Sequence, residues 1–343
     1  MTSSPRRVTM AAIAAAAEVS VPTVSRVLNG RGDVAEETRT RVESVLGELG
    51  YARNRRRKTQ PARIIDLLCH EISPWAAEII SGASAVALAA KSRIAVTMVS
   101  SNADIEQWLK GVANGHTDGV ILGLTELSPL HRSRLAALRV PVVIVDPVGR
   151  PDPKVLTIGA ANWAGGLAAT EHLVQLGHQR IATISGNPAL PCSQARLDGY
   201  RAALERAGIG YDPELVAAGD FHYESALAAA LDLLRLPHRP TAIFAASDVQ
   251  AMGVYEAARQ NGLRVPEDLS VVGFDDVPMA QWVSPPLTTM RQPLCEMATM
   301  ATKTLLAGGT DGLQNRVELA TALVVRSSTQ ALRQPAARKR SRA

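Results

Sequence analysis

Side chains that suit contact with DNA gather near the start of the chain. Ser25 and Arg26 are adjacent in a segment with helical spacing, and four consecutive cations follow at 55–58. An arginine can donate two hydrogen bonds to guanine and a serine can bond either base, so this pair suits the reading of base edges. Residues 1–63 carry a net charge of +6, which favours a polyanionic partner. The alternatives are a solvated arginine and a basic terminus without a partner.

A second group of chemically useful side chains lies in the body of the chain, where residues 64–333 carry a net charge of −5. A pocket for a polyhydroxylated ligand needs carboxylates and a guanidinium for paired hydroxyls, and an aromatic face for the C–H side of the ring. Aromatic residues make up only 3% of the sequence, and Trp75, Phe221 and Trp282 stand at expected strand ends or helix starts, as do His70 and Glu71. Packing in the core is the alternative for each aromatic ring.

Signatures of catalysis, metal binding or cofactor binding are missing from the sequence. It contains no P-loop, G-x-S-x-G, H-E-x-x-H or G-x-G-x-x-G motif, and its three cysteines lie more than a hundred residues apart. Asp275 and Asp276 are adjacent, but neighbours in a strand point to opposite faces, which suits them poorly to joint acid–base work. We therefore expect no catalytic residue, no metal site, no cofactor and, from the cysteine spacing, a reducing compartment.

Short helical patterns position the basic group. Thr9 can cap a helix over 10–17, a second helix follows Ser20, and a third spans 36–49. Ala35 stands at the cap of the third helix, which should cost about 1 kcal/mol relative to serine. Helices joined by a tight turn in this way are typical of a helix-turn-helix domain.

This region resembles the amino-terminal domain of the LacI-type (lactose-repressor) family of bacterial transcription regulators. The resemblance is carried by Val8-Thr9-Met10, by the unbroken run from Val19 to Asn29, by Thr38-Arg39 with Val42, and by Leu49-Gly50-Tyr51 with Asn54. It implies that Val21, Pro22 and Arg26 choose bases and that Thr9, Thr23, Ser25 and Asn29 mostly hold phosphates.

The segment after the helices departs from the family pattern. Relatives commonly place a short helix there whose leucine enters the minor groove, whereas this chain has Gln60 at that position and Pro61 directly after it. Asn54, Arg55, Arg56 and the two cations that follow are therefore expected to contact DNA by charge and groove width, without unstacking bases.

From Ile64 onward, short apolar runs alternate with helical patterns, which predicts parallel sheets covered by helices. Strands are expected at 64–69, 94–99, 119–124, 141–145, 181–184, 241–245 and 269–274. Some 260 residues exceed one such sheet, so two lobes are expected, with ligand held between them at the carboxyl ends of the strands. The family resemblance continues through Gly177–Ile181, Ala195–Tyr200, Ser247-Asp248 and Leu269–Asp276, and through Pro285–Pro293.

The resulting fold class is an N-terminal three-helix helix-turn-helix domain plus an α/β two-lobe effector domain like the periplasmic binding proteins. The expected boundaries are 1–53 for the DNA-binding domain, 54–63 for a basic hinge, 64–163 with 292–323 for the N-terminal lobe, 164–291 with 324–333 for the C-terminal lobe, and 334–343 for a basic disordered tail.

The resemblance also assigns side chains to the pocket. It implies that Trp75 and Phe221 form its walls and that Asp146, Arg196, Ser247, Asp275 and Gln292 bond the ligand. For Arg196 and Asp275 the alternative is a structural ion pair. Asp248 can equally be a helix cap.

The function that follows is a cytoplasmic, sequence-specific transcriptional regulator, most simply a repressor. Its expected partners are a palindromic double-stranded DNA operator, a small-molecule effector that is first of all a saccharide, and a second copy of itself, with a tetramer as an alternative. A membrane partner is not expected, because no uncharged run exceeds 16 residues.

Three rival functions are weighed beside it. A purine-type corepressor suits the same pocket class, but a family nucleobase binder has an arginine where this chain has Leu190. An exported sugar receptor needs Arg6-Arg7 and the apolar stretch after them to be a signal peptide, and Glu18 interrupts that stretch. An enzyme acting on a sugar or nucleoside lacks a nucleophile or a metal cluster.

Overall fold

A computed structural model of the chain describes residues 9–28, 33–49, 62–125, 127–149, 152–309 and 315–332. The chain divides into two compact units, Met1–Pro61 and Ala62–Ala343. The expectations for Asn29, Asn54, Arg55, Arg56 and the tail 334–343 fall outside the described residues.

The first unit contains the helices α1 (Met10–Ala16), α2 (Val21–Leu28) and α3 (Glu36–Glu48), and the axes of α1 and α2 meet at 102°. Thr9 Oγ1 accepts from the Ala12 amide at 3.3 Å and Ser20 Oγ accepts from the Thr23 amide at 3.3 Å, so both serve as N-caps. Apolar residues from all three helices form one small buried core: Ile13, Ala14, Ala17, Val24, Val27 and Val42. The described helices thus have the arrangement of a helix-turn-helix.

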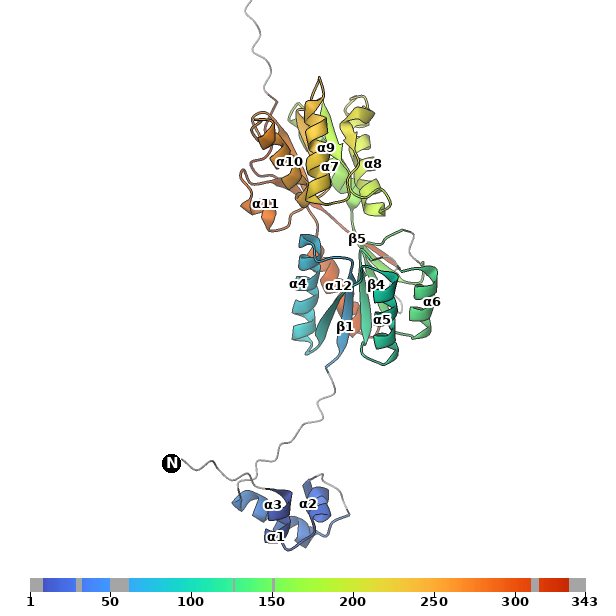
Figure 1. Ribbon diagram of the computed structural model, residues 1–343, viewed down its shortest axis with the longest axis vertical. Helices are drawn as coiled ribbons and strands as arrows, with labels where there is room; N and C mark the ends of the chain where they lie inside the picture. Colours follow the sequence, from blue (N-terminus) through green and yellow to red (C-terminus); the bar gives the residue numbers. More distant parts are fainter. Residues whose placement is uncertain are drawn as a thin grey trace, which may run out of the picture. The chain divides into compact units, whose positions relative to one another are not determined.

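The described residues of the second unit form two six-stranded sheets, one in each lobe (Figure 1). The N-terminal lobe has the order β11-β5-β4-β3-β1-β2, with all pairs parallel. Its strands are β1 Ile64–Cys69, β2 Arg93–Met98, β3 Gly119–Gly123, β4 Val142–Val145, β5 Leu156–Ala160 and β11 Arg316–Leu319.

The C-terminal lobe has the order β12-β10-β9-β8-β6-β7. Its strands are β6 Ile181–Ile184, β7 Val216–Ala217, β8 Ala242–Ala245, β9 Ser270–Asp275, β10 Thr288–Arg291 and β12 Ala322–Val324. The expected parallel sheets are confirmed, with one antiparallel pair at an edge, where β12 runs antiparallel to β10. An edge strand can do so since it arrives from the other lobe without a covering helix.

Helices cover both faces of each sheet, as the alternation of strands and helices requires. In the N-terminal lobe, α4 (Pro74–Ala89) and α12 (Leu294–Leu306) pack on one face, and α5 (Asn102–Ala113) and α6 (Pro129–Ala137) on the other (Figure 1). One face of the sheet in the C-terminal lobe is covered by α7 (Asn162–Gln175) and α8 (Pro191–Arg206). The other face is covered by α9 (Tyr223–Arg235), α10 (Asp248–Gln260) and α11 (Met279–Trp282). A 3₁₀ turn spans Pro213–Leu215.

Within the described ranges the chain passes between the lobes three times. The first crossing joins β5 to α7 at Ala161, the second joins β10 to α12 through Gln292-Pro293, and the third joins β11 to β12 through residues 320–321. The last crossing thus precedes the expected boundary at 323/324, because β12 already pairs with β10 from Ala322.

Candidate functional site

A cleft of about 670 Å³ lies between the two lobes of the second unit. Its lining comes from loops at the carboxyl ends of strands: residues 69–71 after β1, 99–102 after β2, 123–125 after β3, 220–222 after β7, and Ser247 and Asp275 at the ends of β8 and β9. Loops at the carboxyl ends of two parallel sheets are where ligands bind in open α/β folds. The volume is within the 300 to 1,000 Å³ range of small-molecule sites.

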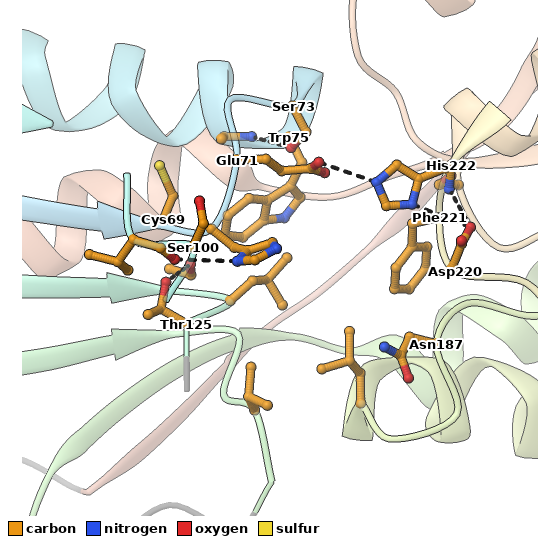
Figure 2. A pocket seen from close by; sticks show the side chains of 18 of the residues that line it. Cys69, Glu71, Ser73, Trp75, Ser100, Thr125, Asn187, Asp220, Phe221 and His222 are labelled. Atoms are coloured by element: carbon orange, nitrogen blue, oxygen red, sulfur yellow. Dashed lines mark hydrogen bonds and ion pairs between the residues drawn. The ribbon is translucent and has the colours of Figure 1, made fainter. Parts of the chain in front are cut away.

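Two aromatic rings face this cleft from opposite lobes (Figure 2). Trp75 is the second residue of α4, where Ser73 caps the helix and Pro74 fills the first position. Phe221 has a backbone φ of +75°, and a Cβ at Gly186 would come within 2.1 Å of its ring. Glycine at 186 therefore leaves the room that this strained placement of the Phe221 ring needs.

Arg196 forms the centre of a buried polar network. Its Nε donates to Asn162 Oδ1 at 2.8 Å, and its Nη1 donates to the Ala246 carbonyl at 2.5 Å and lies 3.7 Å from Asp275 Oδ1. Gln292 donates to the same carboxylate at 2.5 Å. The guanidinium also lies over the Phe274 ring at 3.7 Å, so packing and hydrogen bonds both fix its position.

Burial shapes the charges of this network. It raises the pKa of Asp275 to about 6 and the pKa of Asp146 to about 6, while the charge of Arg196 opposes both shifts. The charge of Arg196 thus offsets part of the cost of burying both carboxylates. Hydroxyl groups of a bound ligand could supply the further hydrogen bonds that such buried carboxylates need.

The seven expected effector residues occupy one region, at two depths. Trp75, Phe221, Ser247 and Asp275 line the cleft. Arg196, Asp146 and Gln292 are 3 to 4% exposed and lie behind that lining, where they interact with Asp275 or with one another. All seven residues therefore lie in the lining of the cleft or directly behind it, and their contact with a ligand stays a prediction.

Ser247, and not Asp248, caps α10. Its Oγ accepts from the Gln250 amide at 3.1 Å. The Asp248 carboxylate points inward and accepts from the Val277 amide at 2.9 Å and from Thr289 Oγ1 at 2.5 Å. Burial, followed by the charge of Asp275, raises its pKa well above the ordinary value.

A residue that the sequence did not indicate, His222, bridges the lobes. Its Nε2 lies 3.2 Å from Glu71 Oε2, and its Nδ1 lies 3.3 Å from Asp220 Oδ1 (Figure 2). All three side chains line the cleft. Hydrogen bonding to Glu71 raises the pKa of His222, with burial opposing the shift.

Two further residues were proposed from loop position. His70, proposed together with Glu71, lines the cleft. Trp282 is 79% exposed at the end of α11 and is not part of the lining that the described residues form.

The outer face of α2 presents the expected DNA-reading side chains. Val21, Pro22 and Arg26 are exposed, and Thr23 and Ser25 are partly exposed, while Val24 and Val27 are buried in the core. Arg26 Nε lies 3.9 Å from Asp33 Oδ2, with both side chains 56% exposed. An ion pair of this length and exposure is weak, so it leaves the guanidinium able to turn toward DNA.

The described residues contain no group of three or more His, Cys, Asp or Glu side chains that could hold a metal ion. They also contain no single helix long and apolar enough to cross a membrane; α1 and α2 reach that length only as a pair bent by 102°.

Comparison with known proteins gives matches to both units. Residues 9–54 match the model of bacterial regulatory proteins of the lacI family, and residues 170–329 match a periplasmic binding protein-like domain. The transcriptional regulator CelR of Thermobifida fusca is 37% identical over 340 residues, covering 94% of this chain and 98% of the relative.

Solved structures agree with this relationship. A complex of the transcriptional regulator CelR with cellobiose is 34% identical, has a TM-score of 0.71 and covers 94% of this chain and 100% of that one. The lac repressor dimer bound to operator and the anti-inducer ONPF is 28% identical, with a TM-score of 0.70 and coverage of 95% and 100%. With its helix-turn-helix unit and its two-lobed unit both matched, this chain belongs to the lacI family of bacterial transcriptional regulators.

Proposed function

We propose that this chain is a repressor that binds a palindromic operator as a homodimer and that a saccharide bound between its lobes controls operator binding. The observation that carries this proposal is the cleft of about 670 Å³ whose lining acid, Asp275, is bonded to Arg196 and Gln292. Because Gln292 belongs to the second crossing between the lobes, a ligand at Asp275 acts beside the segment about which the lobes move.

Several features of the cleft favour a sugar as effector. Trp75 and Phe221 offer apolar faces from opposite lobes, and Asp275, Ser247 and Asn187 offer polar groups between them. Rings with hydroxyls on their edges and C–H groups on their faces match this alternation. The CelR structure described with cellobiose makes this disaccharide the first compound to test. A purine corepressor is the second candidate, and Leu190 in the lining offers such a base no charged partner.

Two observations support homodimer formation: the symmetry of a palindromic operator and the exposed apolar side chains of the N-terminal lobe. One α2 reads one half-site, so a palindromic operator needs two copies held about one helical turn apart. In the N-terminal lobe, three large apolar side chains are 56 to 79% exposed: Ile72 just before α4, Leu88 near the end of α4 and Met98 at the end of the edge strand β2. Large apolar side chains that stay exposed around a sheet edge suit a subunit contact. The mass of the protein in solution distinguishes a dimer from a tetramer.

The proposal assigns the protein to the cytoplasm, where operator DNA is found, and assigns no enzymatic activity to it. It is tested by titrating full-length protein onto a labelled palindromic site selected in vitro, with and without cellobiose, and by measuring its mass in solution. Operator binding as a dimer that cellobiose weakens is expected. Recovery of the sugar unchanged after prolonged incubation is expected as well, and its consumption would indicate an enzyme.

A further inference from the structure

Asp275 is the last residue of β9 and Asp276 follows it, and both have left-handed backbone conformations, with φ of +120° and +59°. Their side chains have separate partners. Asp275 lines the cleft and contacts Arg196 and Gln292, whereas the Asp276 side chain is 2% exposed and lies between two other arginines.

Both arginines lie on segments that adjoin crossings between the lobes. Arg291 is the last residue of β10, directly before the second crossing, and its Nε donates to Asp276 at 2.7 Å. Arg326 follows β12, the strand that enters from the third crossing, and donates to the other Asp276 oxygen at 2.5 Å. One buried carboxylate therefore holds together the C-terminal-lobe ends of two crossings.

The loop that carries the two aspartates is held firmly on its other side. Asp248 accepts from the Val277 amide and from Thr289 Oγ1 of β10. Arg326 also donates to the Leu287 carbonyl at 2.8 Å. Asp248 thus ties Val277 to Thr289 of β10, and the Gln292 amide donates to the Asp275 carbonyl at 3.1 Å. Because both ends of the segment 275–277 are anchored in this way, we expect a displacement of Asp275 to move Asp276 with it.

We propose that Asp276 is a positioning residue that transmits effector binding at Asp275 to the second and third crossings, through its ion pairs with Arg291 and Arg326. This inference rests on the proposed function, since it concerns the response to the same ligand. Asp276 itself contacts no ligand. Its loss should uncouple the DNA-binding response from effector binding while the cleft still binds the sugar.

The test uses full-length Arg291→Gln, because Arg291 is 57% exposed and its loss leaves Asp276 paired with the more buried Arg326. Asp276→Asn removes both pairs but carries a risk of misfolding. Arg259→Gln is the matched control, since Arg259 is 73% exposed and pairs with Glu256 within α10. Two quantities are measured for each protein: the Kd for cellobiose by calorimetry, and the ratio of operator affinities without and with saturating cellobiose.

We expect Arg291→Gln to keep its cellobiose Kd within about twofold of wild type while the ratio of operator affinities falls by at least about threefold. Arg291→Lys should restore part of that ratio, and Arg259→Gln should leave both quantities unchanged. An Arg291→Gln protein with the wild-type ratio overturns the inference, as does a fall in cellobiose affinity that accounts for the whole change.

Hydrogen exchange separates a failure of this inference from a failure of the proposed function. If wild-type operator affinity does not respond to cellobiose, the proposed effector is wrong. Arg291→Gln must still speed amide exchange at 288–293 and 322–326 relative to Arg259→Gln, because the two crossings lose a common anchor. Unchanged exchange in those segments overturns the role of Asp276.

Discussion

Glu71 and His222 form an ion pair at 3.2 Å, although Glu71 follows β1 in the N-terminal lobe and His222 follows β7 in the C-terminal lobe. The pair spans the cleft within its lining (Figure 2). Asp220, 3.3 Å from the second ring nitrogen, holds the imidazole from behind. Lobe closure and the protonation of one histidine are therefore linked, because the contact is an ion pair only while His222 is charged.

The pH dependence of sugar affinity should reveal this pair. Hydrogen bonding to Glu71 raises the pKa of His222 above its ordinary value of 6.5. The stabilisation of the closed form is thus fully present below pH 6.5 and is lost as the pH rises through the raised pKa. Calorimetry with cellobiose should show affinity falling across that window in wild type and a flatter profile in His222→Gln. The exchange of the two residues, Glu71→His with His222→Glu, should restore the dependence, and equal profiles for wild type and His222→Gln would show that the pair has no role in closure.

The Asp275 and Asp146 carboxyls should add to the stability of the ligand-free protein as the pH falls from 7 to 5. Burial raises the pKa values of Asp275 and Asp146 to about 6, against an ordinary value of 3.8. Groups with a raised pKa contribute stability that is fully present below the unfolded value and is lost as the pH passes upward through about 6. Protonation of these two carboxyls should therefore raise the Tm of the two-lobed unit as the pH falls from 7 to 5, while the partly buried His172 and the buried His178, whose pKa values burial lowers, contribute in the opposite direction. Asp275→Asn should make the change in Tm from pH 7 to pH 5 less favourable than in wild type, whereas Asp198→Asn, which changes an exposed acid on α8, should leave that change as in wild type.

Asp275→Asn should also separate effector binding from operator binding. Asp275→Asn keeps the size of the side chain but removes the charge that a ligand hydroxyl would meet. Loss of a charged hydrogen bond of about 1.5 to 3 kcal/mol predicts cellobiose affinity about 10- to 150-fold lower. Operator affinity without sugar should remain at the wild-type value, since the helix-turn-helix unit is unchanged. Wild-type sugar affinity in this variant would place the ligand elsewhere.

If Arg26 reads bases, its substitution should lower DNA affinity by an amount that depends on the DNA sequence. Arg26→Ala should cost about 1 to 3 kcal/mol on the selected operator and much less on random DNA, because a bidentate contact to guanine has no equivalent at most sites. Arg41→Ala, on the exposed side of α3, removes the same charge and serves as the control. Equal losses on both DNAs would assign Arg26 to phosphate contact.

The basic segment 54–58 lies outside the described residues, and its charges still predict a measurable effect. Changing Arg55, Arg56 and Arg57 to alanine should weaken operator binding at fixed salt. If each contacts one phosphate, the slope of log affinity against log salt concentration should become shallower by about 3. An unchanged slope and affinity would mean that these cations make no DNA contact.

Much of the strand pattern could be predicted from the sequence, since buried parallel strands are nearly continuous apolar runs. The strands β1 and β6 have the expected bounds. β10 was not predicted, because its residues Thr288-Thr289-Met290-Arg291 look like a polar loop. Its buried threonines are tolerated because Thr289 donates to Asp248 and Thr288 Oγ1 accepts from the Arg326 amide. Hydrogen bonds between distant segments have no local sequence signal.

The candidate site was also predictable from the sequence only in part. Loop position and family resemblance indicated Trp75, Phe221 and Asp275, which line the cleft. His222 was missed because its meaning depends on Glu71, 151 positions away in sequence and on the other lobe. Trp282 shared the loop position of the true lining residues, yet α11 turns it to solvent. Only the three-dimensional pairing of loops distinguishes such residues.

Sugar binding between the lobes should change operator binding. Fluorescence anisotropy of a labelled, selected palindromic operator tests this when full-length protein is titrated alone and with a panel of mono- and disaccharides that begins with cellobiose. We expect tight dimeric binding that at least one saccharide weakens by about 5- to 150-fold, with the effect lost in Asp275→Asn. Operator affinity that stays constant across the panel, or a response that survives in Asp275→Asn, would contradict it.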